Sequence, residues 1–85
     1  MAAYELLVKA SAAKEIDAIT AKDRRRIVDR IAVLEHDPRP PGCQKLSGAD
    51  KYRLRQGHYR VVYLIDDAAR QITVFKVGHR RDVYR

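Results

Sequence analysis

The clearest pattern in the chain is an alternation of apolar and basic residues along positions 52–63. The apolar members are Tyr52, Leu54, Val61 and Tyr63, and the basic members are Arg53, Arg55 and Arg60. Gly57 lies between the two halves, and period-two alternation around a short turn with glycine is typical of a β-hairpin. The stretch therefore predicts two antiparallel strands with one apolar face and one basic face.

Two turn registers fit this hairpin. With residues 57 and 58 as the loop, Arg55 lies opposite Arg60. With residues 56 and 57 as the loop, Arg53 lies opposite Arg60. Both registers keep the three arginines on one face, whereas a three-residue loop would send every side chain to the opposite face. Because like charges that face each other across strands oppose pairing, the cluster favours an anion-binding site over a role in stabilising the free fold.

The N-terminal half reads as one strand and two helices. Residues 4–9 have the composition of a short strand. Residues 11–19 predict a helix capped by Ser11, and residues 20–36 predict a second helix opened by a capping-box-like pair, Thr20 and Asp23. The second helix must stop before Pro38. The residues expected to face a core are Ala12, Ile16, Ile19, Ile27, Val28, Ile31 and Leu34.

Residues 37–48 contain three prolines and two glycines and read as a loop that includes Cys43. The second hairpin strand runs to about Ile65, and a turn follows over residues 66–70. Residues 72–77 are apolar on both faces, which suits a strand in the interior of a sheet. Residues 78–85 read as a polar tail. The order β-α-α-β-β-β predicts one α+β domain over residues 1–85, with two helices on one face of a mainly antiparallel sheet and the arginines on the other face.

The charge of the chain is concentrated in its second half. The formal net charge is +7 and the sequence pI is near 9.9. Residues 1–44 hold eight Lys or Arg against seven Asp or Glu, whereas residues 45–85 hold ten against four. A concentrated positive field indicates a nucleic acid, an anionic membrane or an acidic protein as partner.

Several classes of chemistry find no support in the sequence. Cys43 is the single cysteine, so an intrachain disulfide is excluded. No Asp/Glu pair or His cluster indicates a metal, and we expect no cofactor. No apolar run approaches the roughly 18 residues of a membrane span. The first five residues lack the basic start of a signal peptide, so we expect the protein in the cytoplasm, away from membranes.

Four segments resemble the RelE/ParE toxin superfamily of bacterial toxin–antitoxin systems, and its RelE branch in particular. They are residues 45–48 (Lys-Leu-Ser-Gly), 52–55 (Tyr-Arg-Leu-Arg), 57–63 (Gly-His-Tyr-Arg-Val-Val-Tyr) and 77–84 (Val-Gly-His-Arg-Arg-Asp-Val-Tyr). Each segment is short, but their order and spacing together are specific. The resemblance covers nearly the whole chain.

The resemblance implies a toxin that cleaves mRNA in the A site of the 70S ribosome. In this family no metal takes part: the ribose 2′-hydroxyl attacks the adjacent phosphate and leaves a 2′,3′-cyclic end. The resemblance also implies a cognate antitoxin protein that wraps and blocks the toxin. A basic groove should itself attract an acidic or amphipathic partner segment.

The functional residues of the family carry over unevenly. Its strand arginine matches Arg60, the arginine of its Val-Gly-x-Arg segment matches Arg80, and its C-terminal tyrosine matches Tyr84, although fewer residues separate the last two here. Lys51 and Arg53 occupy the region of its lysines. The other basic residues expected to contact RNA are Lys45, Arg55, His58, His79, Arg81 and Arg85.

The proposed chemistry assigns a role to each catalytic candidate. Arg60 is suited to stabilise a phosphorane, since a guanidinium can grip two phosphate oxygens. Arg80 would supply charge near the leaving oxygen, and Tyr84 would stack on a base or orient the phosphate. Arg53 stands where a general-base lysine is expected, yet an arginine stays protonated.

The general base therefore stays open at the level of sequence. Lys51 is one candidate, because neighbouring positive charges favour a neutral amine. The imidazoles of His58 and His79 are two others, since imidazole titrates near neutral pH. Positioning of the RNA by the ribosome would supply much of the rate.

Two other functions remain open. A ParE-type toxin would share the fold and inhibit DNA gyrase by binding it. A non-catalytic RNA-binding module would bind many RNAs with strong salt dependence and cleave none.

Overall fold

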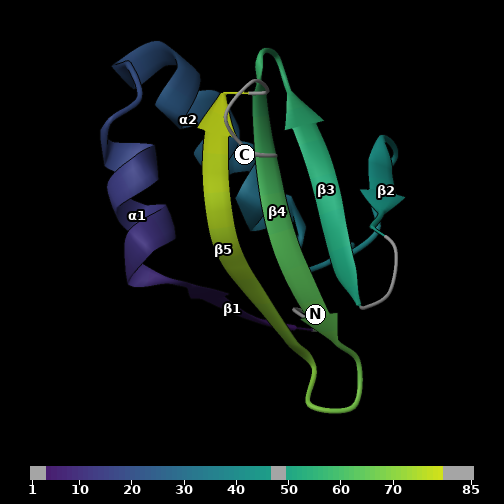
Figure 1. Ribbon diagram of the computed structural model, residues 1–85. Coiled ribbons are helices and arrows are strands. Elements are labelled where there is room, and N and C mark those ends of the chain that lie inside the picture. Colours follow the sequence, from purple (N-terminus) through teal and green to yellow (C-terminus); the bar gives the residue numbers. More distant parts are fainter. Residues whose placement is uncertain (1–3, 47–49, 80–85) are drawn as a thin grey trace.

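Two helices pack against a five-stranded sheet (Figure 1). The computed structural model describes residues 4–46 and 50–79. The elements are β1 (Glu5–Val8), α1 (Ala10–Asp17), α2 (Ala21–Val33), β2 (Cys43–Lys45), β3 (Lys51–Gln56), β4 (Tyr59–Asp66) and β5 (Gln71–His79). The strand order is β1-β5-β4-β3-β2, with β1 parallel to β5 and the other pairs antiparallel. The predicted α+β class is confirmed, in a mixed sheet with one strand more than expected.

The additional strand is β2, which lies inside the stretch predicted as a loop. Its three residues pair antiparallel with β3, and Cys43, opposite Leu54, is therefore a strand residue. A strand this short shows no alternation, and its pairing partner lies further along the chain. The predicted polar tail, residues 78–85, began too early, because Gly78 and His79 belong to β5 and pair with the start of β4.

The helices begin differently from the capping prediction. α1 starts at Ala10 with Lys9 as its N-cap, so the assignment of Ser11 as cap was wrong. Thr20 is the N-cap of α2 as predicted, but no side-chain capping bond forms there. Its hydroxyl instead donates to Asp23 Oδ2 at 3.4 Å. α2 ends at Val33, three residues before the predicted end.

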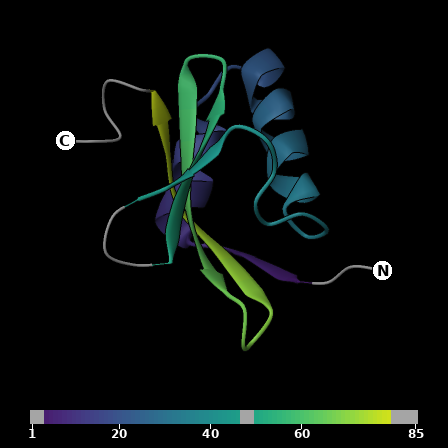
Figure 2. The same ribbon diagram turned by 90° about the vertical axis from the view of Figure 1, so that its right-hand side faces the viewer.

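The core lies between the helices and one face of the sheet. α1 packs against β5, and α2 contacts β3 and β4 (Figure 2). Ile27 and Leu34 are fully buried, whereas Val28 is 46% exposed, so its assignment to the core was wrong. One residue advances about 100° around a helix, and only a narrow stripe of α2 meets the sheet. The buried cluster comprises Ala12, Ile19, Ile27, Ile31, Leu34, Tyr52, Leu54, Val61, Tyr63, Ile65, Ile72, Val74 and Val77.

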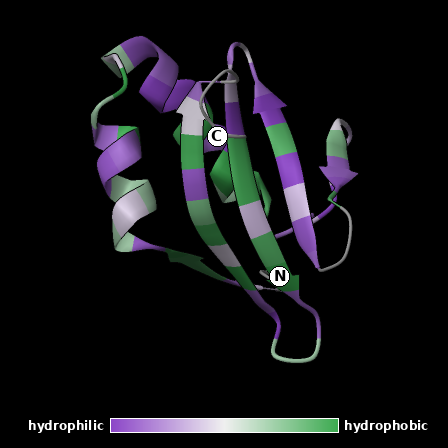
Figure 3. Ribbon diagram, viewed as in Figure 1, coloured by the Kyte–Doolittle hydropathy of each residue, from purple (hydrophilic) through white to green (hydrophobic). Residues whose placement is uncertain are grey.

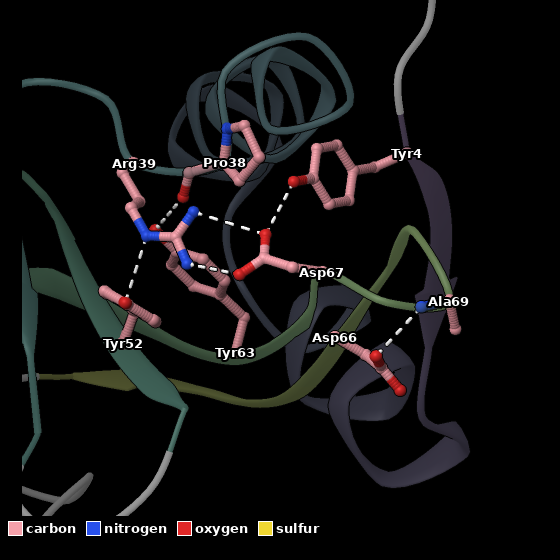
Figure 4. Close-up of polar contacts among 8 residues, drawn as sticks. All are labelled: Tyr4, Pro38, Arg39, Tyr52, Tyr63, Asp66, Asp67 and Ala69. Atoms are coloured by element: carbon pink, nitrogen blue, oxygen red, sulfur yellow. Dashed lines mark hydrogen bonds and ion pairs between the residues drawn. The ribbon is translucent and has the colours of Figure 1, made fainter.

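A polar network fastens the loop after α2 to the end of the sheet (Figure 4). Asp67, in the turn between β4 and β5, accepts hydrogen bonds from Arg39 Nη2 at 2.9 Å and from the hydroxyl of Tyr4 at 2.6 Å. Arg39 Nε donates to the Tyr52 hydroxyl at 3.0 Å. The hydroxyl of the fully buried Tyr63 donates to the Pro38 carbonyl at 2.8 Å. The network thus connects the N-terminal segment and the loop after α2 with β3, β4 and the turn that follows β4.

This network predicts acid sensitivity. The Arg39 guanidinium, followed by the Tyr4 hydroxyl, holds the pKa of Asp67 below its ordinary value. Its stabilising contribution is therefore present above the unfolded pKa of about 3.9 and is lost as the pH falls through the folded pKa. We expect Asp67→Asn to melt at a lower temperature than wild type at neutral pH, with a difference that shrinks below about pH 4. Thermal denaturation from pH 7 to pH 2 measures this.

The matched control is Asp29→Asn, an exposed carboxylate on α2. A melting-temperature difference between wild type and Asp67→Asn that stays constant across the whole pH range would contradict the assigned role of Asp67.

Candidate functional site

The hairpin register confirms that the three arginines share one face of the sheet. Arg55 lies opposite Arg60 and Arg53 lies opposite Val62, so residues 57 and 58 form the loop, which is the first of the two registers considered. Gly57 has a φ of +60°, in the left-handed region that favours glycine in such a turn. The apolar residues that alternate with these arginines face the helices and are buried: Tyr52, Leu54, Val61 and Tyr63. In Figure 3 the alternation of hydrophobic and hydrophilic residues is visible as bands along β3 and β4.

We call the sheet surface turned away from the helices the arginine face. Its residues form rows across the strands, because partners in neighbouring strands project to the same side. From the hairpin turn downwards the rows are Arg55–Arg60–Gly78, then Gln44–Arg53–Val62–Lys76, then Lys51–Leu64–Thr73–Leu7. Among the described residues, five cations from three strands therefore share this face: four lie in the two rows nearest the turn, and Lys51 lies in the third.

Arg60 occupies the centre of the first row. It lies on β4, between Arg55 of β3 and Gly78 of β5, and it is only 9% exposed. Gly78 contributes no side chain beside it. Like charges directly opposite each other destabilise a strand pair by about 0.2–1 kcal/mol. The Arg55–Arg60 pair places two like charges opposite each other on this face, a geometry in which two guanidiniums can bind one anion.

Lys76 is a member of this face that the sequence interpretation missed. It pairs with Val62 on β4, and the ladder carries a bulge at Val62/Tyr63. The bulge turns two successive residues of β5, Phe75 and Lys76, away from the core. Val74 before them and Val77 after them are both buried in the core. The signal in the sequence is the break in period two between positions 74 and 77, because strict alternation would have buried a lysine.

The other predicted site residues occupy different places. Lys51 is on the arginine face, with its Nζ 5.2 Å from the centroid of the Phe75 ring. Lys45 pairs with Tyr52 and so lies on the helix side at the sheet edge. His58 and His79 stack on each other at 6.0 Å, and His79 pairs with Tyr59, whose ring packs against the core. These histidines are brought together at the hairpin end, but on the side away from the arginines.

A shallow pocket opens at the edge of the arginine face. It is lined by Gly42, Gln44, Arg53 and Arg55 and has a volume of about 350 Å³. Arg53 Nη2 donates a hydrogen bond to Gln44 Oε1 across the β2–β3 pair. No carboxylate is among these lining residues, so the pocket suits an anion.

Four predicted site residues lie outside the described part of the chain: Arg80, Arg81, Tyr84 and Arg85. Within residues 4–46 and 50–79, no group of three or more His, Cys, Asp or Glu side chains is placed to hold a metal ion. Among the same residues, no helix combines the length and the apolar character needed to cross a membrane.

Solved structures of RelE proteins share this fold. A chain of the archaeal RelE–RelB complex from Pyrococcus horikoshii superposes with a TM-score of 0.85 and 26% identity, covering 95% of this chain and 99% of that one. The isolated RelE toxin of E. coli superposes with a TM-score of 0.80 and 26% identity, covering 96% and 92%. The fold is thus that of a RelE-like toxin.

The sequence comparisons agree. Toxin RelG of Mycobacterium tuberculosis is 40% identical over 37 residues, a match that spans 44% of this chain and 42% of that relative. The family model for the ParE toxin of type II toxin–antitoxin systems (parDE) matches residues 6–84. The chain therefore belongs to the ParE toxin family, within the RelE/ParE superfamily that the sequence pattern predicted.

Proposed function

We propose that this toxin is an endoribonuclease that cleaves mRNA in the ribosomal A site. The observation that carries the proposal is the arginine face, on which Arg53, Arg55 and Arg60 converge with Lys51 and Lys76. A phosphodiester on this surface would be stabilised by these converging cations. Similarity to RelE structures over nearly the whole chain supports the same conclusion.

The reaction needs a base, positive charge and a proton for the leaving group. The 2′-oxygen loses its proton and bonds to phosphorus, the bond from phosphorus to the 5′-oxygen breaks, and a 2′,3′-cyclic phosphate and a 5′-hydroxyl result. Arg60 is proposed to stabilise the phosphorane, because its central position lets one guanidinium bind two oxygens. Arg80 is proposed to supply charge at the leaving oxygen and Tyr84 to stack on a base.

Lys76 is proposed as the group that accepts the 2′-hydroxyl proton. A lysine side chain can act as a base, whereas a guanidinium is a poor one. Gly78 is the partner of Arg60, so Lys76 is its diagonal cross-strand neighbour, at about 7–8 Å between backbones and within reach of long side chains. Lys51 lies in the row beyond Arg53 and is further from Arg60.

This assignment predicts that Lys76→Ala lowers kcat on ribosomes by about 10- to 100-fold, since general bases contribute this much or more and the ribosome supplies positioning. Lys51→Ala is the matched control, with the same charge removed from the same face and a smaller loss expected. Single-turnover cleavage across a range of pH measures both. Equal losses in the two variants would overturn the assignment of Lys76.

The proposed function as a whole is tested in a translation reaction with purified toxin. We expect the mRNA to be cut in the presence of translating ribosomes and to stay intact without them. Binding of mRNA with strong salt dependence and no cleavage under either condition would instead identify a non-catalytic RNA-binding module.

A second candidate function is inhibition of DNA gyrase, which the match to the ParE family model favours. It requires the same fold but no reactive phosphodiester on the arginine face. Supercoiled DNA incubated with gyrase and the toxin distinguishes the two functions. Accumulated cleaved DNA–gyrase complexes, with mRNA left whole, would support the gyrase function and contradict the first proposal.

A cognate antitoxin is proposed as the protein partner. Two of the similar structures are RelE complexes with RelB, from Pyrococcus horikoshii and E. coli. The positive face of this chain suits an acidic or amphipathic segment. Co-expression with the neighbouring small gene should relieve growth inhibition, and a chain that is harmless when expressed alone would contradict the pairing.

A further inference from the structure

We propose that the pocket at the β2–β3 edge binds a second phosphate of the RNA strand and that Arg30 of α2 contributes to this subsite. The inference rests on the proposed function, because the ligand is the RNA that the toxin would cleave. We call this pocket, lined by Gly42, Gln44, Arg53 and Arg55, the edge pocket.

The edge pocket presents donors in an ordered arrangement. Gln44 Oε1 accepts a hydrogen bond from Arg53 Nη2, which leaves the two N–H groups of the Gln44 amide as donors. This bond also holds the Arg53 side chain in place where it lines the pocket. Arg55 is exposed on the same face, two residues along β3. Guanidinium and amide donors without a carboxylate among them match the oxygens of a phosphate.

Arg30 extends this positive surface around the edge of the sheet. Its Nη2 would lie 3.9 Å from a Cβ built on Gly42, so the guanidinium sits next to the glycine that lines the pocket. Gly42 has a φ of +91°, in the left-handed region that favours glycine. The structure thus places the Arg30 guanidinium against the loop after α2.

The Nε of Arg30 makes the position unusual. It is buried and has no hydrogen-bond partner within the described residues. A buried donor left unsatisfied destabilises a fold, so this position of the Arg30 guanidinium is costly in the free protein. Three guanidiniums from two elements therefore surround Gly42 and Gln44.

The place of the edge pocket in the sheet identifies which phosphate it would bind. Neighbouring strands are about 4.8 Å apart, so β2 lies roughly 10 Å from β4, which carries Arg60. A phosphate held at the outer wall of the edge pocket, beside Gln44, would lie two strands from Arg60 and belong to a neighbouring nucleotide, with Arg55 between the two phosphates. The pocket would hold the strand in register so that the scissile phosphate faces Arg60.

The test is RNA binding as a function of salt, with Arg30→Gln as the main variant. The probe is a short single-stranded RNA with 2′-O-methyl groups, which resists 2′-hydroxyl attack. Each phosphate contact contributes about 0.7 to the slope of log K against log salt for a single strand. We expect Arg30→Gln to lower this slope by about 0.7. On ribosomes the same variant should raise KM and leave kcat unchanged.

Arg25→Gln is the matched control, because Arg25 is exposed and lies about 140° around α2 from Arg30. It removes the same charge from the same helix and should leave the slope unchanged. Gln44→Glu is a second variant of nearly identical shape, which places a carboxylate in the edge pocket and should weaken binding further. Circular dichroism confirms that each variant is folded.

An unchanged slope in both Arg30→Gln and Gln44→Glu would overturn the inference. Weaker antitoxin binding with unaltered RNA binding would also overturn it, because the pocket would then serve the protein partner. If wild type neither binds nor cleaves RNA, the proposed function itself fails. If wild type does both, and Arg30→Gln and Gln44→Glu both match it in slope and KM, the second subsite alone fails.

Discussion

Replacing Arg60 by alanine is expected to lower the rate of mRNA cleavage on translating ribosomes by about 10²- to 10³-fold, the usual cost of losing a donor to the developing charge of a transition state. Arg60 is the central cation of the arginine face, with Arg55 opposite on β3 and Gly78 opposite on β5. Its loss removes the guanidinium best placed to bind two oxygens of the phosphorane. Single-turnover cleavage with saturating toxin measures the effect on the chemical step.

Because Arg60 is 9% exposed, its removal also affects packing, and two controls separate packing from catalysis. Arg60→Lys keeps a long stem and the charge but loses the paired donors, so we expect an intermediate rate. Arg26→Ala removes an exposed arginine from α2 and should cleave as wild type does. A folded Arg60→Ala variant that cleaves at the wild-type rate would remove Arg60 from the mechanism.

The largest effect on stability is expected from Leu54→Ala, with a loss of about 2–5 kcal/mol in the free energy of unfolding. Leu54 is fully buried and stands on β3 between the two arginines of that strand. Truncation leaves a cavity between the sheet and the helices, and the total stability of a small domain is only about 5–15 kcal/mol. Urea denaturation followed by circular dichroism measures the loss.

Leu7→Ala is the matched control, since it removes the same atoms from a side chain that is 40% exposed on β1. Surface substitutions usually change stability by about 0.5 kcal/mol or less. Equal losses at both positions would contradict the assignment of Leu54 to the core. They would also contradict the assignment of the β3 arginines to the opposite face of the sheet.

The hairpin could be predicted from sequence because its information is local. Alternation between residues 52 and 63 fixes which side chains share a face, and both possible turns preserved that result. Alternation could not distinguish the two possible turns. The pairing of Arg55 with Arg60 shows that residues 57 and 58 form the loop. The likeness to RelE/ParE toxins was also within reach, because it depends on the order of short segments.

The features that were missed depend on partners distant in sequence. β2 is three residues long and is defined by its pairing with β3, so no hydrophobic periodicity in the sequence predicts it. Lys76 reaches the arginine face through a bulge in the β4–β5 ladder. The approach of Arg30 to Gly42 depends on where the loop after α2 runs, which no local pattern in the sequence predicts.

The most direct test of the arginine face as a site of RNA cleavage is to map mRNA 3′ ends after incubation of the toxin with translating ribosomes. The proposed mechanism predicts new ends within the A-site codon that carry a 2′,3′-cyclic phosphate, formed by wild type and about 10²- to 10³-fold more slowly by Arg60→Ala. Intact mRNA after incubation with folded wild-type toxin, or ends formed at the same rate by wild type and Arg60→Ala, would contradict it.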